Sequence, residues 1–144
     1  MAITTNAIAN SFKKQLLEAT HNFKASGGNT FKLAMYTNAA TLGKSTTSFT
    51  TGNEVSSSGY SSGGSALVNV GTSVATNTAI TDFADLSFVG VTLTARGALI
   101  YNDTASGDPA VAVLDFGGDK TASAGTFTIQ FPAFTTSAAI LRIA

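Results

Sequence analysis

The sequence predicts a mainly β protein: a β-sandwich or jelly-roll-like barrel with one N-terminal amphipathic helix. Two apolar runs, residues 97–101 and 110–114, are separated by a polar stretch rich in Asn, Asp and Gly, which is the pattern of a β-hairpin. Residues 126–131 alternate between apolar and polar side chains, as a half-buried strand requires. Because a sheet must cover its apolar face, several such strands favour a closed, two-layered fold.

The N-terminal region has the spacing of a helix. Over residues 7–23 the apolar side chains recur every three or four positions and so share one helix face. The glycines at 27 and 28 end any continuation. We therefore expect an N-terminal arm and helix in residues 1–28 and a β-domain in residues 29–144. The apolar face consists of Ile8, Phe12, Leu16, Ala19 and Phe23.

The strands follow the helix. The first is predicted at residues 30–37, where Phe31, Leu33 and Met35 alternate with other side chains. Residues 38–66 are mostly Ser, Thr, Gly and Asn, and predict a long exposed loop. Further strands are expected at residues 66–70, 74–80, 88–94, 98–101, 110–116, 126–131 and 140–143.

The central hairpin allows a register to be predicted. Residues 98–101 should pair antiparallel with residues 110–114, with Tyr101 opposite Ala110. Continued without interruption, this register places Leu99 opposite Ala112 and Gly97 opposite Leu114. It also places Arg96 opposite Asp115, as a structural ion pair across the strands.

Composition excludes several classes of function. Eight basic residues balance eight acidic ones and are scattered, so we expect no nucleic-acid partner. Cysteine is absent, which excludes disulfides, thiolate metal sites and cysteine nucleophiles. No apolar run approaches the length of a membrane span, and we expect no membrane partner. Thr and Ser greatly outnumber the charged residues, a surface chemistry common on extracellular and virion β-proteins.

Few residues suggest chemistry. His21 is the only histidine, and it is expected to be exposed or to cap the helix C-terminus. Residues 102–109 offer oxygen ligands, but they lack the spacing of an EF-hand and are typical of a hairpin turn. Residues 117–120 lack the context of a phosphate-binding loop and predict another turn. We therefore expect no catalytic residue, no cofactor and no metal site.

The candidate interaction residues lie on the helix and in the long loop. The helix face of Ile8, Phe12, Leu16 and Phe23 either covers the sheet of its own chain or reaches another subunit by way of the glycines at 27 and 28. Tyr60 is flanked by Gly and Ser, and is the one aromatic residue expected to be exposed and to face a ligand.

Several stretches of the chain resemble a family of small structural proteins of tailed bacteriophages, some members of which resemble head decoration, or cement, proteins. The resemblance covers nearly the whole length and lies in framework strands and turns. The similar stretches are NSFK at 10–13 with Leu16 and Leu17, TFKLAMYT at 30–37, AATL at 39–42, ARGALIYN at 95–102 and AVLDFG at 112–117.

The resemblance implies a non-enzymatic virion structural protein without a cofactor. On this basis we expect a capsid cement protein on the outer head surface, made in the bacterial host cytoplasm. Its expected partners are the phage major capsid protein and further copies of itself in a homo-oligomer, most plausibly a trimer. The alternative is a receptor-binding or carbohydrate-binding β-module of a phage tail or fibre, because such modules are also small and Thr-rich.

Overall fold

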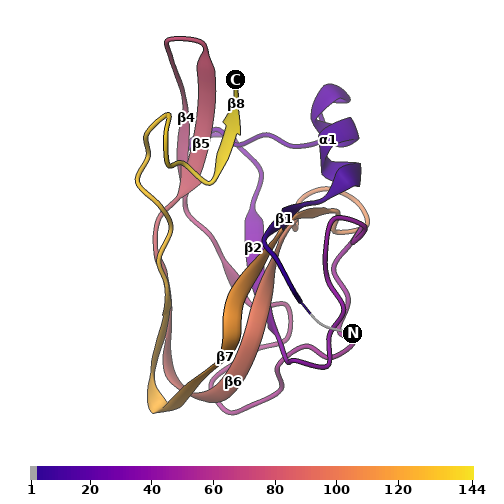
Figure 1. The fold of residues 1–144 in the computed structure, drawn as a ribbon, viewed down its shortest axis with the longest axis vertical. Helices are drawn as coiled ribbons and strands as arrows, with labels where there is room; N and C mark the ends of the chain where they lie inside the picture. The colour runs from indigo at the N-terminus through magenta and orange to yellow at the C-terminus, as the bar shows by residue number, and fades with distance from the viewer. Residues whose placement is uncertain (1–2) are drawn as a thin grey trace.

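The computed structural model describes residues 3–144 and contains two antiparallel sheets with one short helix near the N-terminus (Figure 1). The mainly β prediction is confirmed. The five-stranded sheet has the order β1-β7-β6-β2-β3, and the three-stranded sheet has the order β4-β5-β8. The elements are β1 (Ala7–Ile8), α1 (Asn10–Leu17), β2 (Phe31–Tyr36), β3 (Ser65–Ala66), β4 (Asn69–Ala75), β5 (Thr78–Phe83), β6 (Leu86–Asn102), β7 (Ala110–Ile129) and β8 (Leu141–Ile143).

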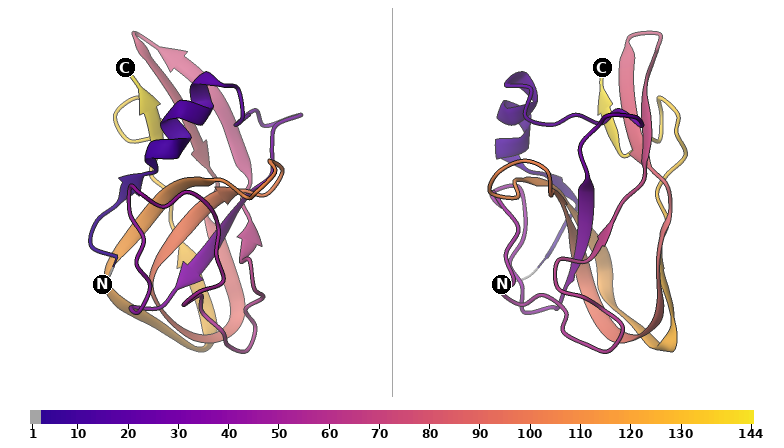
Figure 2. Two further views of the ribbon diagram at one scale, coloured as in Figure 1. Left: turned by 90° about the vertical axis from the view of Figure 1, so that its right-hand side faces the viewer. Right: turned by 180° about the vertical axis from the view of Figure 1, so that it is seen from behind.

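One long hairpin, β6–β7, supplies most of the framework. Its strands are 17 and 20 residues long, and they pair from Leu86 opposite Ile129 up to Tyr101 opposite Ala110. Several register shifts interrupt the ladder, and such bulges let a ribbon bend sharply. Figures 1 and 2 show the result: the hairpin folds back on itself at the lower end of the molecule, so that its two arms face each other.

The continuous hairpin corrects two sequence predictions. Residues 88–94 and 98–101 belong to one strand, β6, rather than to two. Residues 117–120 are not a chain-reversing turn, because β7 runs through them. Between the pairs Gly97–Asp115 and Ala95–Lys120, β7 contains extra residues that bulge out of the ladder. Gly117 has φ of 78°, a conformation that glycine adopts without a steric penalty.

The predicted hairpin register is correct at its tip and shifted below it. Tyr101 lies opposite Ala110, as predicted, but an irregularity after this pair moves the following pairs by one residue, so that Leu99 faces Val113 and Gly97 faces Asp115. Arg96 and Asp115 nevertheless form an ion pair. The hydrogen bond from Arg96, together with the backbone N–H of Gly117, lowers the pKa of the Asp115 carboxyl.

The second sheet corrects the strand predicted at residues 74–80. The chain reverses at Thr76 and Asn77, and the flanking residues pair as β4 and β5. Thr76 has a left-handed φ of 56°, a conformation that tight hairpin turns require. Glycine is the usual sequence signal for such a turn, and it is absent at this position. The sequence therefore predicts one strand across residues 74–80, where the structure has a turn between two strands.

The helix is shorter than predicted. α1 ends at Leu17, and Ala19 has φ of 59°, while the backbone N–H groups of Ala19 and Thr20 bond back to the carbonyls of Leu16 and Gln15. This is a left-handed helix termination, adopted without glycine. Beyond it the chain is irregular, and Phe23 reaches the interior from a coil segment rather than from a helix.

One buried cluster includes residues from both sides of residue 28. Ile3 and Phe12 of the N-terminal region are enclosed together with Phe31 of β2. The ring of Phe23 stacks on that of Phe31 with a centroid distance of 4.3 Å, and Phe83 of β5 lies 5.8 Å from Phe31. This series of rings joins the N-terminal region to both sheets.

The segment at 38–66 is irregular, as predicted, but it does not lie free in solvent. It forms isolated bridges to the framework at Tyr36–Glu54 and Ser48–Pro109. Its apolar side chains at Ala40, Leu42, Val55 and Tyr60 are buried. These four buried side chains pack the segment against the framework, although most of its residues are polar.

Candidate binding cleft

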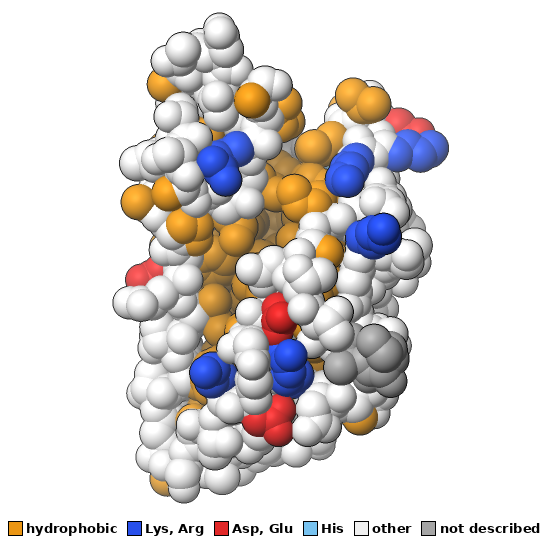
Figure 3. Space-filling model, viewed as in Figure 1, with side chains coloured by type: hydrophobic (Ala, Val, Ile, Leu, Met, Phe, Trp, Pro, Cys, Tyr) orange, Lys and Arg blue, Asp and Glu red, His pale blue; other side chains and the backbone are white. Residues whose placement is uncertain are grey.

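An apolar cleft of about 320 Å³ lies between α1 and the three-stranded sheet. In Figure 3 it is the hydrophobic hollow between the two lobes at the top of the molecule. Its size is at the small end of the range of about 300–1,000 Å³ for ligand sites. Four of the five sequence-predicted interaction residues line it, namely Ile8, Phe12, Leu16 and Phe23.

The N-terminal region forms one wall. Ile8 ends β1 and Leu16 lies on the last turn of α1, and both are partly exposed toward the cleft. Phe12 and Phe23 are buried behind them, with ring centroids 5.9 Å apart. The predicted apolar surface is therefore divided: the rings of Phe12 and Phe23 fill the core of this chain, whereas Ile8 and Leu16 remain accessible. Only Phe12 and Leu16 lie on α1, because Ile8 belongs to β1 and Phe23 to the coil beyond the helix.

One face of the three-stranded sheet forms the opposite wall. Val74, Ala79 and Ile143 lie directly opposite one another on β4, β5 and β8, so their side chains share this face. Val74 is 69% exposed and Ile143 is 60% exposed. The apolar cleft thus continues into an apolar sheet face that nothing in residues 3–144 covers.

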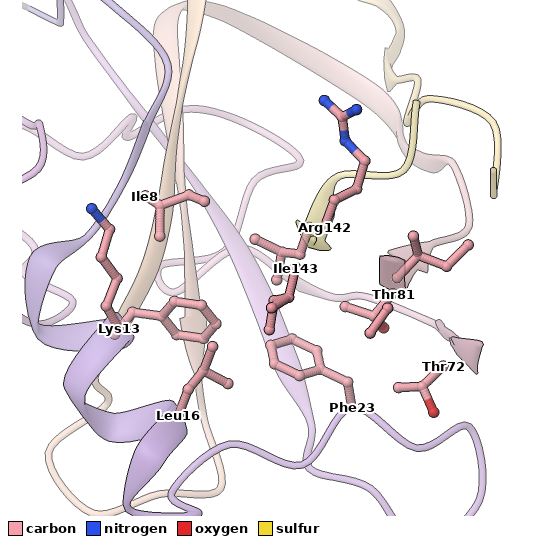
Figure 4. Close-up of a pocket in the computed structure, with 12 residues that line it drawn as sticks. Ile8, Lys13, Leu16, Phe23, Thr72, Thr81, Arg142 and Ile143 are labelled. Atoms are coloured by element: carbon pink, nitrogen blue, oxygen red, sulfur yellow. The ribbon is translucent and has the colours of Figure 1, made fainter. Parts of the chain in front are cut away.

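Two basic side chains stand at the mouth. Lys13 extends from α1 and Arg142 from β8, and Figure 4 shows both pointing toward the top of the view from opposite walls, with Lys13 beside Ile8 and Arg142 above Ile143. One Arg142 N–H donates to the carbonyl of Ser137 at 3.0 Å. Within residues 3–144 no carboxylate lies within ion-pair distance of either cation. The mouth therefore carries net positive charge above an apolar floor.

Tyr60, the fifth predicted interaction residue, lies elsewhere and is not exposed. Its ring is buried 5.7 Å from that of Phe88. Its hydroxyl accepts the backbone N–H of Met35 at 2.9 Å and donates to a carboxylate oxygen of Glu54 at 2.7 Å. The prediction of an exposed ring is wrong, because the surrounding Ser and Gly residues allow the loop to pack this side chain against the sheet.

Glu54 is a residue that the sequence did not single out. Besides Tyr60, its carboxylate accepts the hydroxyl of Ser62 at 2.8 Å and the backbone N–H of Gly63 at 2.7 Å. These contacts hold the loop closed around one side chain. No sequence signal marked this role, since a single Glu among Ser and Gly is typical of any solvated loop.

Replacing Tyr60 with Phe should lower the free energy of unfolding by about 1–3 kcal/mol, because the buried N–H of Met35 then has no acceptor. Urea unfolding measures the loss. Tyr36→Phe is the matched control: the Tyr36 hydroxyl donates to the carbonyl of the exposed Thr50, which water can then solvate. Equal losses in the two variants would contradict the role of the Met35 contact.

His21 is buried, which corrects the prediction of an exposed or capping histidine. Its ring lies 4.8 Å from that of Phe12, Nε2 is 2.9 Å from Oε1 of Gln15, and Nδ1 is 3.1 Å from Nδ2 of Asn102. The amide nitrogen of Asn102 can only donate, so the contacts select a neutral imidazole with its proton on Nε2. Burial lowers the pKa of His21 to about 4. This side chain therefore connects the N-terminal region to the end of β6.

The other candidate ligands are held by contacts within the chain. In the hairpin tip, the amide oxygen of Asn102 accepts two backbone N–H groups, and Asp103 pairs with Lys32 at 3.3 Å. Across residues 3–144, no three His, Cys, Asp or Glu side chains come together in a way that could hold a metal ion. In the same range, none of the helical structure is long and apolar enough to cross a membrane.

Comparisons with protein-family models, with curated proteins and with solved structures find no match to this chain.

Proposed function

We propose that this protein is a non-enzymatic structural protein of a bacteriophage virion, a cement protein that binds the outer surface of the head and bridges coat subunits. The observation that carries the proposal is the apolar cleft with its uncovered sheet face. Exposed apolar surface of this kind marks protein–protein contacts. Together with the resemblance of the framework strands to small phage structural proteins, it favours a protein that works by association.

Cement action follows from mass balance. A protein that binds only the assembled shell stabilises the shell, by about 2.7 kcal/mol per site when its free concentration is a hundred times its dissociation constant. In this proposal the protein binds as a homotrimer, because head lattices offer threefold positions at which one contact repeats. The cleft of each copy then faces the major capsid protein.

The test begins with the location of the protein in intact particles of the phage that encodes it. Cryo-electron microscopy should find it on the head lattice, and particles assembled without it should release their DNA at a lower temperature. Adding the purified protein back should restore the release temperature, because the added binding energy must be lost before the shell opens.

An add-back series ties the effect to the cleft. Ile143→Asp should fail to restore the release temperature, because it places a charge on the apolar contact face. Val89→Asp is the matched control, since Val89 is 75% exposed and does not line the cleft. If the protein is found only on the tail, or if the release temperatures with and without it are equal, the cement function is contradicted and a receptor-binding module is favoured.

A further inference from the structure

We propose that the cleft binds an extended segment of the partner protein in which an apolar side chain is flanked by carboxylates. This inference rests on the proposed function for the partner's identity, but not for the chemistry of the segment. Three features of the cleft carry it: an apolar floor, two cations without carboxylate partners, and two open sheet edges.

The floor sets the apolar part of the ligand. Ile8, Leu16 and Ile143 reach into the space between the walls (Figure 4), and the volume of about 320 Å³ suits a few side chains rather than a whole helix. A polar side chain placed there would lose its water without gaining a hydrogen bond. The inserted group is therefore aliphatic or aromatic.

The mouth sets the charged part. Lys13 and Arg142 flank the opening from opposite walls, and within residues 3–144 neither pairs with a carboxylate. The nearby Glu18 is engaged by Lys14 on the outer side of the helix. Carboxylates on either side of the inserted residue would neutralise both cations, and the guanidinium of Arg142 still has donors available.

The borders set the backbone conformation. β1 is an edge of the five-stranded sheet and β8 is an edge of the three-stranded sheet, and both line the cleft. A second hollow of about 290 Å³ shares Ile8 and Arg142 with the cleft and continues it between these edges. Edge strands offer unpaired backbone groups, which an extended chain can use and a small amphiphile cannot. An extended peptide is therefore the occupant that uses every feature.

A second copy of this chain does not supply such a segment. Its run of acidic and apolar residues at 82–85 begins within β5, where Asp82 is buried, and the run at 114–116 lies within β7. Both are engaged in the fold of their own chain. The occupant comes from a different protein.

The test uses a fluorescein-labelled peptide, Ser-Gly-Glu-Val-Ile-Val-Glu-Gly-Ser, with binding measured by fluorescence anisotropy. A peptide with Lys in place of both Glu residues should bind at least about tenfold more weakly at low salt. A peptide with Pro in place of the central Ile should also bind about tenfold more weakly, because it loses both a backbone donor and the inserted side chain.

Protein variants assign the effect to the cleft. K13E/R142E should weaken binding of the acidic peptide by at least about tenfold, whereas K14E/K24E, which makes the same change in net charge at exposed sites outside the cleft, should leave it within about twofold. Circular dichroism verifies that both variants fold. Ile8→Ser gives a second, charge-independent test, because it removes an apolar contact without changing the net charge, and it should also abolish binding.

Three results would overturn the inference: no binding of the acidic peptide up to 1 mM (about 4 kcal/mol of binding free energy), equal binding of the Lys peptide, or equal loss in K14E/K24E. Displacement by dodecanoate with no peptide binding would instead identify an anionic amphiphile as the ligand. The outcome is independent of particle location. Peptide binding by a protein found on the tail would retain the inference and contradict the cement function.

Discussion

Replacing Gly64 with Ala should destabilise the fold by about 3–5 kcal/mol. Gly64 has φ of 76°, and a Cβ built there would lie 1.7 Å from the carbonyl oxygen of Leu33 in β2. The atoms that the new Cβ would meet belong to the backbone of Leu33 and Ala34, so no flexible side chain can move aside. The substitution strains the backbone of residue 64, which is in the left-handed region, and it also pushes the loop away from β2. Urea unfolding at neutral pH measures the loss in free energy of unfolding.

Gly107→Ala separates these two causes. Gly107 has φ of 83°, but its added Cβ would meet nothing within 4 Å, so it pays only the conformational cost of about 1–2 kcal/mol. The difference between the variants reports the steric clash against β2. Losses of the same size would show that the loop around Gly64 yields without cost, contrary to its anchoring by Glu54.

The second large effect is a loss of stability in acid that depends on His21. Its pKa in the folded protein, about 4, lies below the ordinary value of 6.5. The unfolded chain therefore binds more protons between these values, and the free energy of unfolding falls as the pH is lowered from about 6.5 to about 4. The contribution lost is about 2–3 kcal/mol.

His21→Gln isolates this contribution, because glutamine keeps polar atoms near Gln15 and Asn102 but does not titrate. Urea unfolding of both proteins at pH 7.5, 6.5, 5.5 and 4.5 should give a steeper decline for the wild type. Another carboxyl also contributes to the pH dependence: burial raises the pKa of Asp82, which opposes the loss. The comparison between the two proteins removes this effect. If the free energy of unfolding declined in parallel for the two proteins, the inference that His21 is buried and neutral would be contradicted.

Periodicity predicted the strands whose side chains show a clear apolar pattern along the sequence. The run at 30–37 matches β2 closely, and the pairing of residues 98–101 with 110–114 was correct because a short polar turn joins them. The turn at Thr76 and the termination at Ala19 could not be read, because left-handed residues other than glycine leave no compositional mark. The bulge at 116–119 was mistaken for a turn because both use glycine.

The sequence predicted one wall of the cleft but not the other. Helical spacing identified Ile8, Phe12, Leu16 and Phe23 as one surface, although only Phe12 and Leu16 lie on α1. The opposite wall was beyond reach, because Ile143 and Arg142 come from the last strand and only the fold brings them near. The predicted exposure of Tyr60 and His21 was wrong for the same reason in both cases. Their flanking sequence is polar, and tertiary contacts buried them regardless.

The pairing of β1 with β7 has a consequence for synthesis of the chain. Ala7 pairs with Val113, so the first strand emerges from the ribosome long before its partner exists. Until then Phe12 and Phe23 have none of the β7 framework to pack against, and apolar side chains exposed in this way are prone to aggregation. The hairpin β6–β7, local in sequence, can form before these distant pairs close, because its loop closure costs less entropy. We therefore expect the pairing of β1 with β7 to be a late step in folding.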